Sequence, residues 1–466
     1  MQEEKIIQTK NCRHCNKSFD ITDRDIEFYD KISPKINWQK FQIPTPTLCP
    51  DCRQQRRLSF RNERKLYRRK CDATGKDIIS IYSPDKPYKV YDQKVRRSDD
   101  RDPMTYARDF DFSKSFTEQF GDLMKEVPRM SLVNDDWTIS QNCSYTNDFW
   151  YWKDCYMCFE MWDAEWCFYC NKCWFWKDLI DCSQVTWSSK SCYQSTDSDN
   201  IYNCFYVKTC SNSNNCYFSE NLTWCENCFL SIWLVNQKFI FLNAIYSELE
   251  YNKFTDRFFN DINYKNESIL KYNNLVKNNI YINQKSSESS IWNWIINSKN
   301  VIWNYIINSN DLKYCTNCDE VSNSYDTQWW KCSFCYESMI PDLSYNNLFT
   351  IYCRESSYIN YSDLCFSCQN CFGCIWLRNK QYCIFNKQYT ESEYFGLVAK
   401  IITHMQSNGE RWEFFHPSLS PFAYNETVAM EYYSVISEDC NKISEDKIYE
   451  NQNLPISSEI LLIQMV

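Results

Sequence analysis

The sequence predicts a mainly β protein, a parallel β-solenoid (β-helix-like) body with an N-terminal treble-clef or zinc-ribbon module and a C-terminal helix. Three observations support this prediction. Cysteines recur every 12 residues through the middle of the chain, two Cys-x-x-Cys motifs lie near its start, and a capping box opens an amphipathic stretch near residue 390. We therefore expect four segments, at 1–70, 71–135, 136–386 and 387–466.

Composition narrows the class of protein. The chain has 466 residues with 51 basic and 60 acidic side chains, so its net charge is −9, which argues against a wholly basic nucleic-acid coat. It has no run of 18 apolar residues, which predicts no membrane span, and its charged start is unlike a secretory signal. We expect a cytoplasmic protein whose 29 cysteines are reduced or metal-bound rather than paired in disulfides.

The first segment carries two cysteine knuckles, Cys12/Cys15 and Cys49/Cys52. Four thiolates at this spacing suit one tetrahedral Zn²⁺, and a closed four-ligand site is structural rather than catalytic. Pro50 suits the first turn of a helix, so the second knuckle is expected to open one, as in a treble clef. The alternative is four reduced cysteines without a metal.

Basic residues follow the second knuckle directly, with one acid among them. A zinc-held helix of this charge could contact phosphates, which makes nucleic acid the first partner to consider. The alternative is a solvated or protein-facing helix, for example one docked on the acidic remainder of the chain. The candidate nucleic-acid contacts are Arg53, Arg56, Arg57, Arg61, Arg64, Lys65, Arg68 and Arg69.

Three shorter patterns predict further secondary structure near these motifs. Thr22 can cap a helix with Ile26, Tyr29 and Ile32 on one face, and residues 77–82 have a β-like sequence. An amphipathic helix is expected after residue 115. Its apolar side is expected to hold Phe116, Phe120, Leu123 and Met124.

The repeat segment contains a ladder of cysteines at positions 143, 155, 167, 192, 204, 216 and 228. The one long step, from 167 to 192, is filled if Leu179 is in register with Cys167. Because leucine cannot bind metal, buried packed thiols are favoured over additional metal sites. Between 229 and 314 cysteine is absent, and isoleucines at 269, 280, 291 and 302 are expected to take its place. The number of strands in each coil stays open.

The tail begins with a second helix signal. Thr390 and Glu393 form a capping box, and apolar residues from Tyr394 to Met405 keep helical spacing until Asn408 and Gly409 end it. The polar stretch 437–453 is expected to be poorly ordered.

Glycine and tryptophan usage is abnormal, with 5 glycines and 18 tryptophans. Many tryptophans stand in turn-like positions, and an 11-residue repeat places Trp292 and Trp303 where glycine would make a tight turn. We therefore hypothesise that the source reads the codon UGA as glycine. Pooling both residue types gives about 5%, close to ordinary glycine usage. The alternative is a genuinely tryptophan-rich protein.

Catalysis has little support in the sequence. Its three histidines are His14, inside a knuckle, and His404 and His416 in the tail, and no nucleotide-binding loop is present. The expected function is that of a zinc-binding interaction protein, which contacts nucleic acid or a protein partner through the basic zinc module and the repeat surface. No small-molecule substrate is indicated. A structural scaffold without nucleic acid and a carbohydrate-active β-helix enzyme are the alternatives.

Several stretches resemble an uncharacterised Cys-rich zinc-ribbon family of candidate-phyla bacteria. The resemblance rests on residues 48–57, 60–67, 82–88, 371–374, 377–382 and 420–427. Some relatives carry an automatic CaiB/BaiF-type CoA transferase label, which nothing in this sequence supports. The resemblance implies no activity, and it implies two departures: Cys71 lacks the second thiol of a further ribbon, and the C-terminal ribbon of some relatives is absent.

The same resemblance implies a second recoded codon. The family tends to have tryptophan where this chain has Arg96, Arg97, Arg101 and Arg411, and glycine where it has Trp412. A lineage that reads UGA as glycine is the source that the resemblance suggests.

Overall fold

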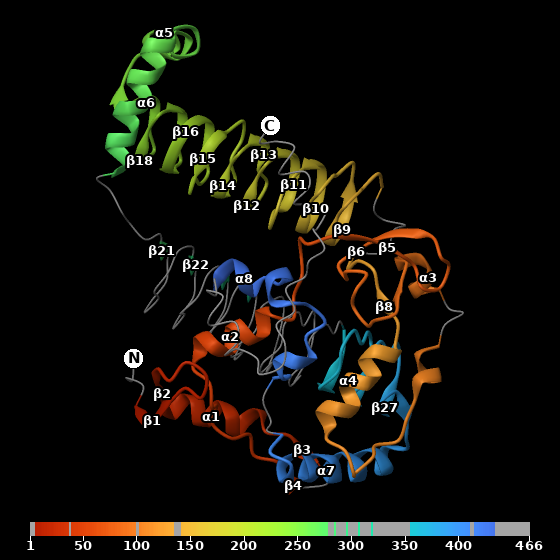
Figure 1. The fold of residues 1–466 in the computed structure, drawn as a ribbon. Coiled ribbons are helices and arrows are strands. Elements are labelled where there is room, and N and C mark those ends of the chain that lie inside the picture. The colour runs from red at the N-terminus through yellow and green to blue at the C-terminus, as the bar shows by residue number, and fades with distance from the viewer. Residues whose placement is uncertain are drawn as a thin grey trace. The chain divides into compact units, whose positions relative to one another are not determined.

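The computed structural model describes residues 5–36, 39–98, 102–134, 141–277, 284–285, 295–296, 306–307, 318–319, 355–410 and 414–433. These residues form a mixed α/β structure in which most elements are strands, in agreement with the predicted β character (Figure 1). The chain divides into two compact units. Unit 1 comprises 1–78, 82–130 and 282–466, and unit 2 comprises 79–81 and 131–281.

Unit 1 begins with an antiparallel hairpin, β1 (Ile6–Asn11) and β2 (Ser18–Thr22), followed by α1 (Asp23–Ile32). Thr22 caps α1 as predicted, because its side chain accepts from the amide of Asp25. The predicted apolar face was wrong at Ile26, which is 38% exposed. The buried stripe runs through Asp25, Phe28, Tyr29 and Ile32 at i, i+3, i+4 and i+7, so Ile26 falls beside it.

The rest of the N-terminal half is built from short elements. Its strands are β3 (Lys35–Ile36), β4 (Gln39–Lys40), β5 (Tyr67–Lys70), β6 (Asp77–Ser80), β7 (Val90–Tyr91) and β8 (Arg129–Met130). Its helices are α2 (Pro50–Leu58), α3 (Gln93–Arg97), the 3-10 turn η1 (Pro103–Tyr106) and α4 (Phe116–Glu126). The predicted apolar side of α4 is confirmed, since all four of its residues are buried.

Unit 2 is dominated by one ladder of parallel strands (Figure 1). Its strands are β9 (Asn147–Lys153), β10 (Phe159–Phe168), β11 (Trp174–Ile180), β12 (Ser183–Thr186), β13 (Lys190–Tyr193), β14 (Thr196–Asp199), β15 (Phe205–Lys208), β16 (Asn214–Thr223), β17 (Glu226–Phe229), β18 (Ile232–Val235) and β19 (Lys238–Phe241), with β20 (Ala244–Ile245) antiparallel at the end. Partners lie 12 residues apart, so Cys167 pairs with Leu179 as predicted.

The long cysteine step has a local cause. Leu179 pairs with Cys192, a spacing of 13, and one residue is inserted at Trp187–Ser188, where both residues have positive φ. The ladder therefore accommodates a single extra residue between β12 and β13 and then returns to its 12-residue register.

A three-residue period underlies the 12-residue one, and the sequence analysis missed it. Through most of the ladder every third side chain is buried, as at Cys155, Cys158 and Met161, and the residue before it has a φ between 45° and 63°. Twelve residues thus make four such triplets. Buried thiols and hydroxyls donate to the carbonyl two residues earlier, so Cys158 Sγ lies 3.4 Å from Tyr156 O and Ser195 Oγ 3.3 Å from Tyr193 O.

Five described tryptophans have a positive φ of this kind: Trp166, Trp187, Trp224, Trp233 and Trp376. The left-handed region costs a side chain with a Cβ about 1–2 kcal/mol, and glycine avoids that cost. The tryptophans therefore stand at positions where the backbone favours glycine, and they share this conformation with other bulky residues of the ladders, such as Tyr206, Phe218 and Leu230. Trp292 and Trp303 lie outside the described residues.

Two helices follow the ladder, where the sequence analysis expected further repeats. They are α5 (Glu248–Asn260) and α6 (Ile262–Lys277). Ile269 lies in α6, so its assignment to the ladder was wrong. The overlooked signal is the capping box of Ser247 and Glu250, which starts α5.

Short parallel strands in unit 1 keep an 11- or 12-residue register. They are β21 (Gln284–Lys285), β22 (Ile295–Ile296), β23 (Ile306–Ile307) and β24 (Cys318–Asp319). Positions 280, 291 and 302 of the predicted isoleucine series, and the polar stretch 437–453, lie outside the described residues.

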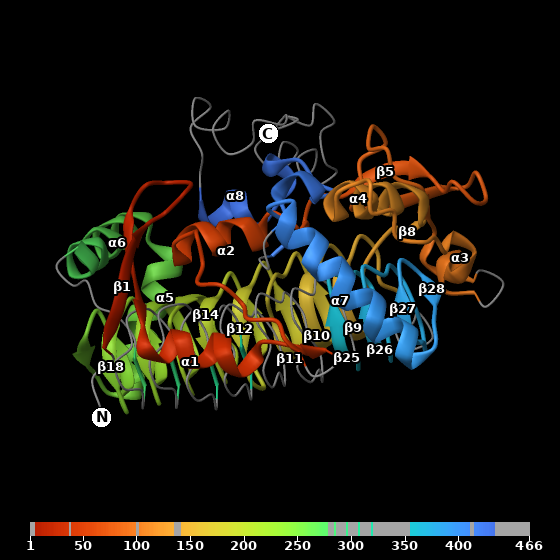
Figure 2. The ribbon, with the colours of Figure 1, turned by 90° about the horizontal axis from the view of Figure 1, so that it is seen from below.

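A second ladder, also in unit 1, is covered by helices (Figure 2). It contains β25 (Ser357–Asn360), β26 (Gln369–Phe372), β27 (Gln381–Ile384) and β28 (Lys387–Gln388), followed by α7 (Glu391–Ser407), which Thr390 and Glu393 cap as predicted. The end of the chain adds η2 (Pro417–Leu419), η3 (Tyr424–Glu426) and α8 (Ala429–Tyr432). Phe116 of α4 packs on Phe372 and Phe385 of this ladder.

The two ladders end in the same way, at an offset of 143 residues. Asn243 and Asn386 each accept from and donate to the backbone 11 residues earlier, and each hairpin leads into a capping box and a helix. Asn227–Tyr251 and Asn370–Tyr394 have the same residue at 12 of their 25 aligned positions, including Trp233 and Trp376. This internal duplication is a second feature that the sequence analysis overlooked.

Candidate metal centre

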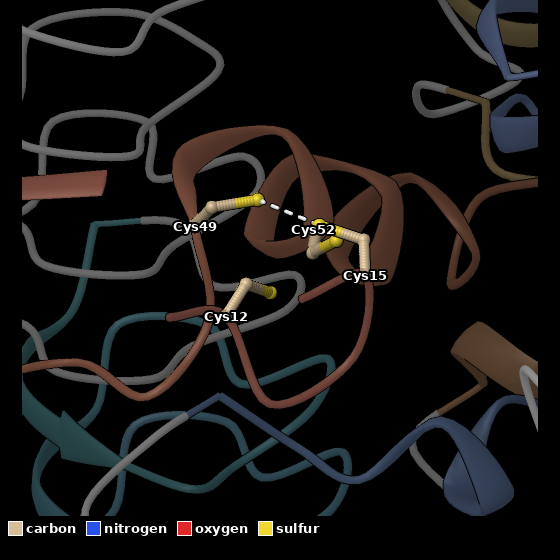
Figure 3. Close-up of side chains that lie close together, drawn as sticks. All are labelled: Cys12, Cys15, Cys49 and Cys52. Carbon is tan, nitrogen blue, oxygen red and sulfur yellow. Dashed lines mark hydrogen bonds between the residues drawn. The ribbon is translucent and has the colours of Figure 1, made fainter. Parts of the chain in front are cut away.

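Four cysteine sulfurs converge at the start of the chain, as the sequence predicts (Figure 3). The Sγ atoms of Cys12, Cys15, Cys49 and Cys52 all lie within 4.8 Å of one another, and Cys15 Sγ is 3.6 Å from Cys49 Sγ. Tetrahedral Zn–S bonds of about 2.3 Å place sulfurs about 3.8 Å apart. The donor set and its spacing therefore fit a single tetrahedral metal ion.

Local backbone geometry explains the convergence. The first knuckle is a tight turn in which the Cys12 amide donates to Lys17 O and the Asn16 amide to Cys12 O, each at 2.9 Å. Asn16 has a φ of 59°, which asparagine tolerates. The Arg13 amide donates to Thr47 O at 3.0 Å and ties the first knuckle to the segment that leads into the second.

Helix α2 positions the second knuckle. Cys49 is its N-cap, Pro50 its first residue and Cys52 lies in its first turn, which confirms the predicted helix start. Helix N-termini favour negative charge, so the two thiols sit where thiolates are stabilised. Cys12, Cys49 and Cys52 are buried, while Cys15 is exposed on the outer side of the cluster.

The thiols compete for one negative charge. The hydrogen bond that the Cys52 thiol donates lowers the pKa of Cys49 to about 5, and the same contact raises the pKa of Cys52 above its ordinary value. Burial raises the pKa of Cys15. A bound divalent cation removes this competition, because it stabilises all four thiolates together.

The predicted basic helix is shorter than expected, and much of its charge is buried. Helix α2 ends at Leu58, so the later basic residues lie in a loop and in β5. Arg53, Arg56, Arg57 and Arg61 are all at most 8% exposed. They lie inside the module, where Arg53 Nη1 is 3.5 Å from the Tyr29 hydroxyl and Arg61 pairs with Glu63.

Part of the remaining basic charge is also engaged. Arg64 donates twice to a single carboxylate oxygen of Glu431, at 2.7 and 3.0 Å, and Arg69 pairs with Asp72 at 3.0 Å. Lys65 is half-buried and Arg68 is exposed. The structure thus buries Arg53, Arg56, Arg57, Arg61 and the side chain of Arg69, and leaves Arg64, Lys65 and Arg68 as the more exposed of the eight candidate nucleic-acid contacts.

A second knuckle-like turn exists at Cys71. Its amide donates to Lys76 O and the Gly75 amide to Cys71 O, both at 2.8 Å, which repeats the hydrogen bonds of the Cys12 turn. Thr74 occupies the place of Cys15. Among the described residues, the cluster of Cys12, Cys15, Cys49 and Cys52 is the only group of three or more with metal-ligand geometry.

The two histidines of the tail lie beside oxygen atoms. His404 Nε2 lies 3.0 Å from Lys114 O, and His416 Nδ1 lies 2.8 Å from the Ser418 hydroxyl. His14 Nδ1 lies 3.4 Å from Cys52 Sγ, at the edge of the cluster.

Comparisons with known proteins give no relative. No family model, no curated protein and no solved structure matches the chain. No helix among the described residues is both long and apolar enough to cross a membrane.

Proposed function

We propose that this chain is a zinc-stabilised binding protein whose first partner class is nucleic acid. The convergence of four cysteine sulfurs carries the proposal. Such a set leaves no open coordination position, so zinc would hold the two knuckles together rather than activate water or substrate. On this proposal the hairpin β1–β2, the helix α2 and their zinc form a treble-clef or zinc-ribbon module.

The exposed basic residues around the module supply the binding surface. Arg68 and Lys70 of β5 and Arg13 and Lys17 of the first knuckle are exposed. Each phosphate contact of this kind releases counterions, so affinity should fall steeply as salt rises. The buried arginines would support the module instead of touching the partner.

Binding to RNA and DNA by the full chain, followed by fluorescence anisotropy at two salt concentrations, tests this proposal. Arg68→Glu with Lys70→Glu should weaken binding at least about tenfold, whereas Lys253→Glu with Lys271→Glu on α5 and α6 should not. Binding that does not respond to salt, or no binding at low salt, would reject nucleic acid as the partner. Replacing Arg53 or Arg56 would test folding instead, because both are buried.

A structural scaffold without nucleic acid is the second candidate. The ion pairs Arg64–Glu431 and Arg69–Asp72 favour it, since they use basic charge within the chain. Zinc content that is intact in a protein without affinity for RNA or DNA would support this candidate.

We also propose that the ladders are closed β-solenoid coils. A 12-residue parallel register, one buried side chain in every three and a left-handed residue before each of them support four sides of three residues. The buried cysteines would then form a packed thiol core, in which serine takes the same place as a donor.

Recoding is a further part of the proposal. Five described tryptophans at positive φ support reading UGA as glycine. Arg96 supports the second codon, because its side chain is buried and its guanidinium carbon lies 2.6 Å from the centroid of a Trp376 ring. Peptide masses from the native source would decide the matter, since glycine at Trp224 and Trp233 is the expected result. The resemblance to the zinc-ribbon family supports the same reading, because that family tends to have glycine where this chain has Trp412.

A further inference from the structure

A cavity of about 630 Å³ opens beside the four-cysteine cluster in unit 1. The first knuckle and helix α2 line it together with the turn before β7, the end of α4 and the segment around η2 and η3. Its volume lies in the range of small-molecule and cofactor sites. Cys52 belongs to its lining, so the cavity and the cluster share a wall.

The charge of the lining is one-sided. Its ionisable residues include Arg13, Arg56, Lys86 and Lys125, and none of the described residues that line it is an aspartate or glutamate. Lys86 is offset by Glu426, 2.9 Å away, and the exposed pair of Lys125 with Asp122 is screened by solvent. Arg13, which is exposed, adds to the positive potential, which low-dielectric walls concentrate on the cavity.

The remaining lining is aromatic or carries hydroxyl groups. Tyr88 and Phe422 present ring surface, and Ser418 and Ser420 offer hydroxyl groups. A ligand that fits such a lining has an anionic group for the guanidinium and ammonium groups and a flat, partly apolar part for the rings. A nucleotide combines both in a molecule of this size.

We propose that this cavity binds the phosphate and base of a single nucleotide, either free or at the 5′ end of a strand. The proposal rests on the proposed nucleic-acid function and places one specific contact beside the zinc module. Exposed basic residues outside the cavity would then track the strand, and the cavity would hold its phosphorylated end.

The test uses the full zinc-loaded chain and four probes: AMP, a 5′-phosphorylated RNA decamer, the same decamer with a 5′-hydroxyl, and a poly-glutamate peptide. The cavity variant is Arg13→Glu with Lys125→Glu. Its matched control is Lys35→Glu with Lys114→Glu, which makes the same charge change at two residues of unit 1 that lie outside the lining and outside the proposed nucleic-acid surface. All four side chains are exposed, so both variants should fold.

We expect the cavity variant to lose about tenfold or more in affinity for AMP and for the phosphorylated decamer, against less than about threefold for the control. The phosphorylated decamer should bind more tightly than the hydroxyl form. Equal binding of both decamers with no effect of the cavity variant would overturn the inference and leave nucleic-acid binding standing.

The other outcomes separate the two proposals. Cavity-dependent binding of AMP without binding of either decamer would support the inference and reject the proposed nucleic-acid function. Equal competition by the poly-glutamate peptide would overturn the nucleotide assignment, and no binding of any probe would reject both.

Discussion

Trp224 offers the most direct test of whether the positive-φ positions of the ladder favour glycine. It has a φ of 57° and is 61% exposed, so its backbone is in the left-handed region while much of its ring is in solvent. Trp224→Ala and Trp224→Gly both remove the ring and its packing. The two variants therefore differ only in the Cβ and in backbone freedom. Comparing their free energies of unfolding isolates the effect of the left-handed backbone at this residue.

The expected magnitude follows from two opposing terms. The left-handed conformation costs alanine about 1–2 kcal/mol, whereas glycine loses about 0.5–1 kcal/mol of extra chain entropy on folding. Trp224→Gly should therefore be more stable than Trp224→Ala by about 1 kcal/mol. For a unit of this size, that free energy corresponds to about 2–4 °C in Tm.

Thr223 is the matched control. It precedes Trp224 in the chain, lies at the end of β16 and is not among the positive-φ residues. At this position Thr223→Gly should be less stable than Thr223→Ala by about 0.5–1 kcal/mol, so the sign of the difference reverses. Thermal unfolding followed by circular dichroism measures both pairs. A glycine variant no more stable than its alanine counterpart at Trp224 would refute the reasoning.

Three further predictions concern unit 1. Arg96→Trp with Trp376→Gly should raise Tm above that of wild type, because the change removes a buried guanidinium and places glycine where the backbone is left-handed. The gain should exceed the sum of the two single changes, since the two side chains are in contact; an additive or destabilising double variant would contradict this. Asp363→Ala should destabilise by about 3–5 kcal/mol in denaturant titration, since it leaves the buried Arg129 without its carboxylate at 3.2 Å, and a loss below about 1 kcal/mol would argue against a buried pair. Hydrogen bonds from Thr390 lower the pKa of Glu393. The stability that these hydrogen bonds add to the folded state is therefore present above the ordinary pKa of Glu393 and is lost as pH falls through the lower folded value. Glu393→Gln should remove that part of the acid dependence of unfolding, and an unchanged pH profile would count against the capping box.

Local signals in the sequence predicted much of the fold. The Thr22 cap of α1, the capping box of α7, the start of α2 at Pro50 and the apolar side of α4 are all confirmed, because each depends on neighbouring residues. The 12-residue register is confirmed at Cys167 and Leu179 for the same reason. The four-cysteine cluster followed from ligand spacing alone.

Features that depend on tertiary packing were harder to predict. Charge suggested that Arg53, Arg56 and Arg57 face solvent, yet the elements packed around α2 bury them. The three-residue period was hidden because serine, valine and leucine share the inner column with cysteine. Helix α5 and the 143-residue duplication were both readable, since Ser247 and Glu250 repeat the pattern of Thr390 and Glu393.

The central claim is that the first four cysteines hold one zinc ion. Elemental analysis of the purified full chain tests it against two double variants. Cys12→Ser with Cys52→Ser removes two proposed ligands, while Cys204→Ser with Cys216→Ser removes two buried ladder thiols, which serine can replace as a donor. We predict that the first variant loses one equivalent of zinc per chain and the second loses none. Equal zinc content in the wild type and both variants would contradict the account.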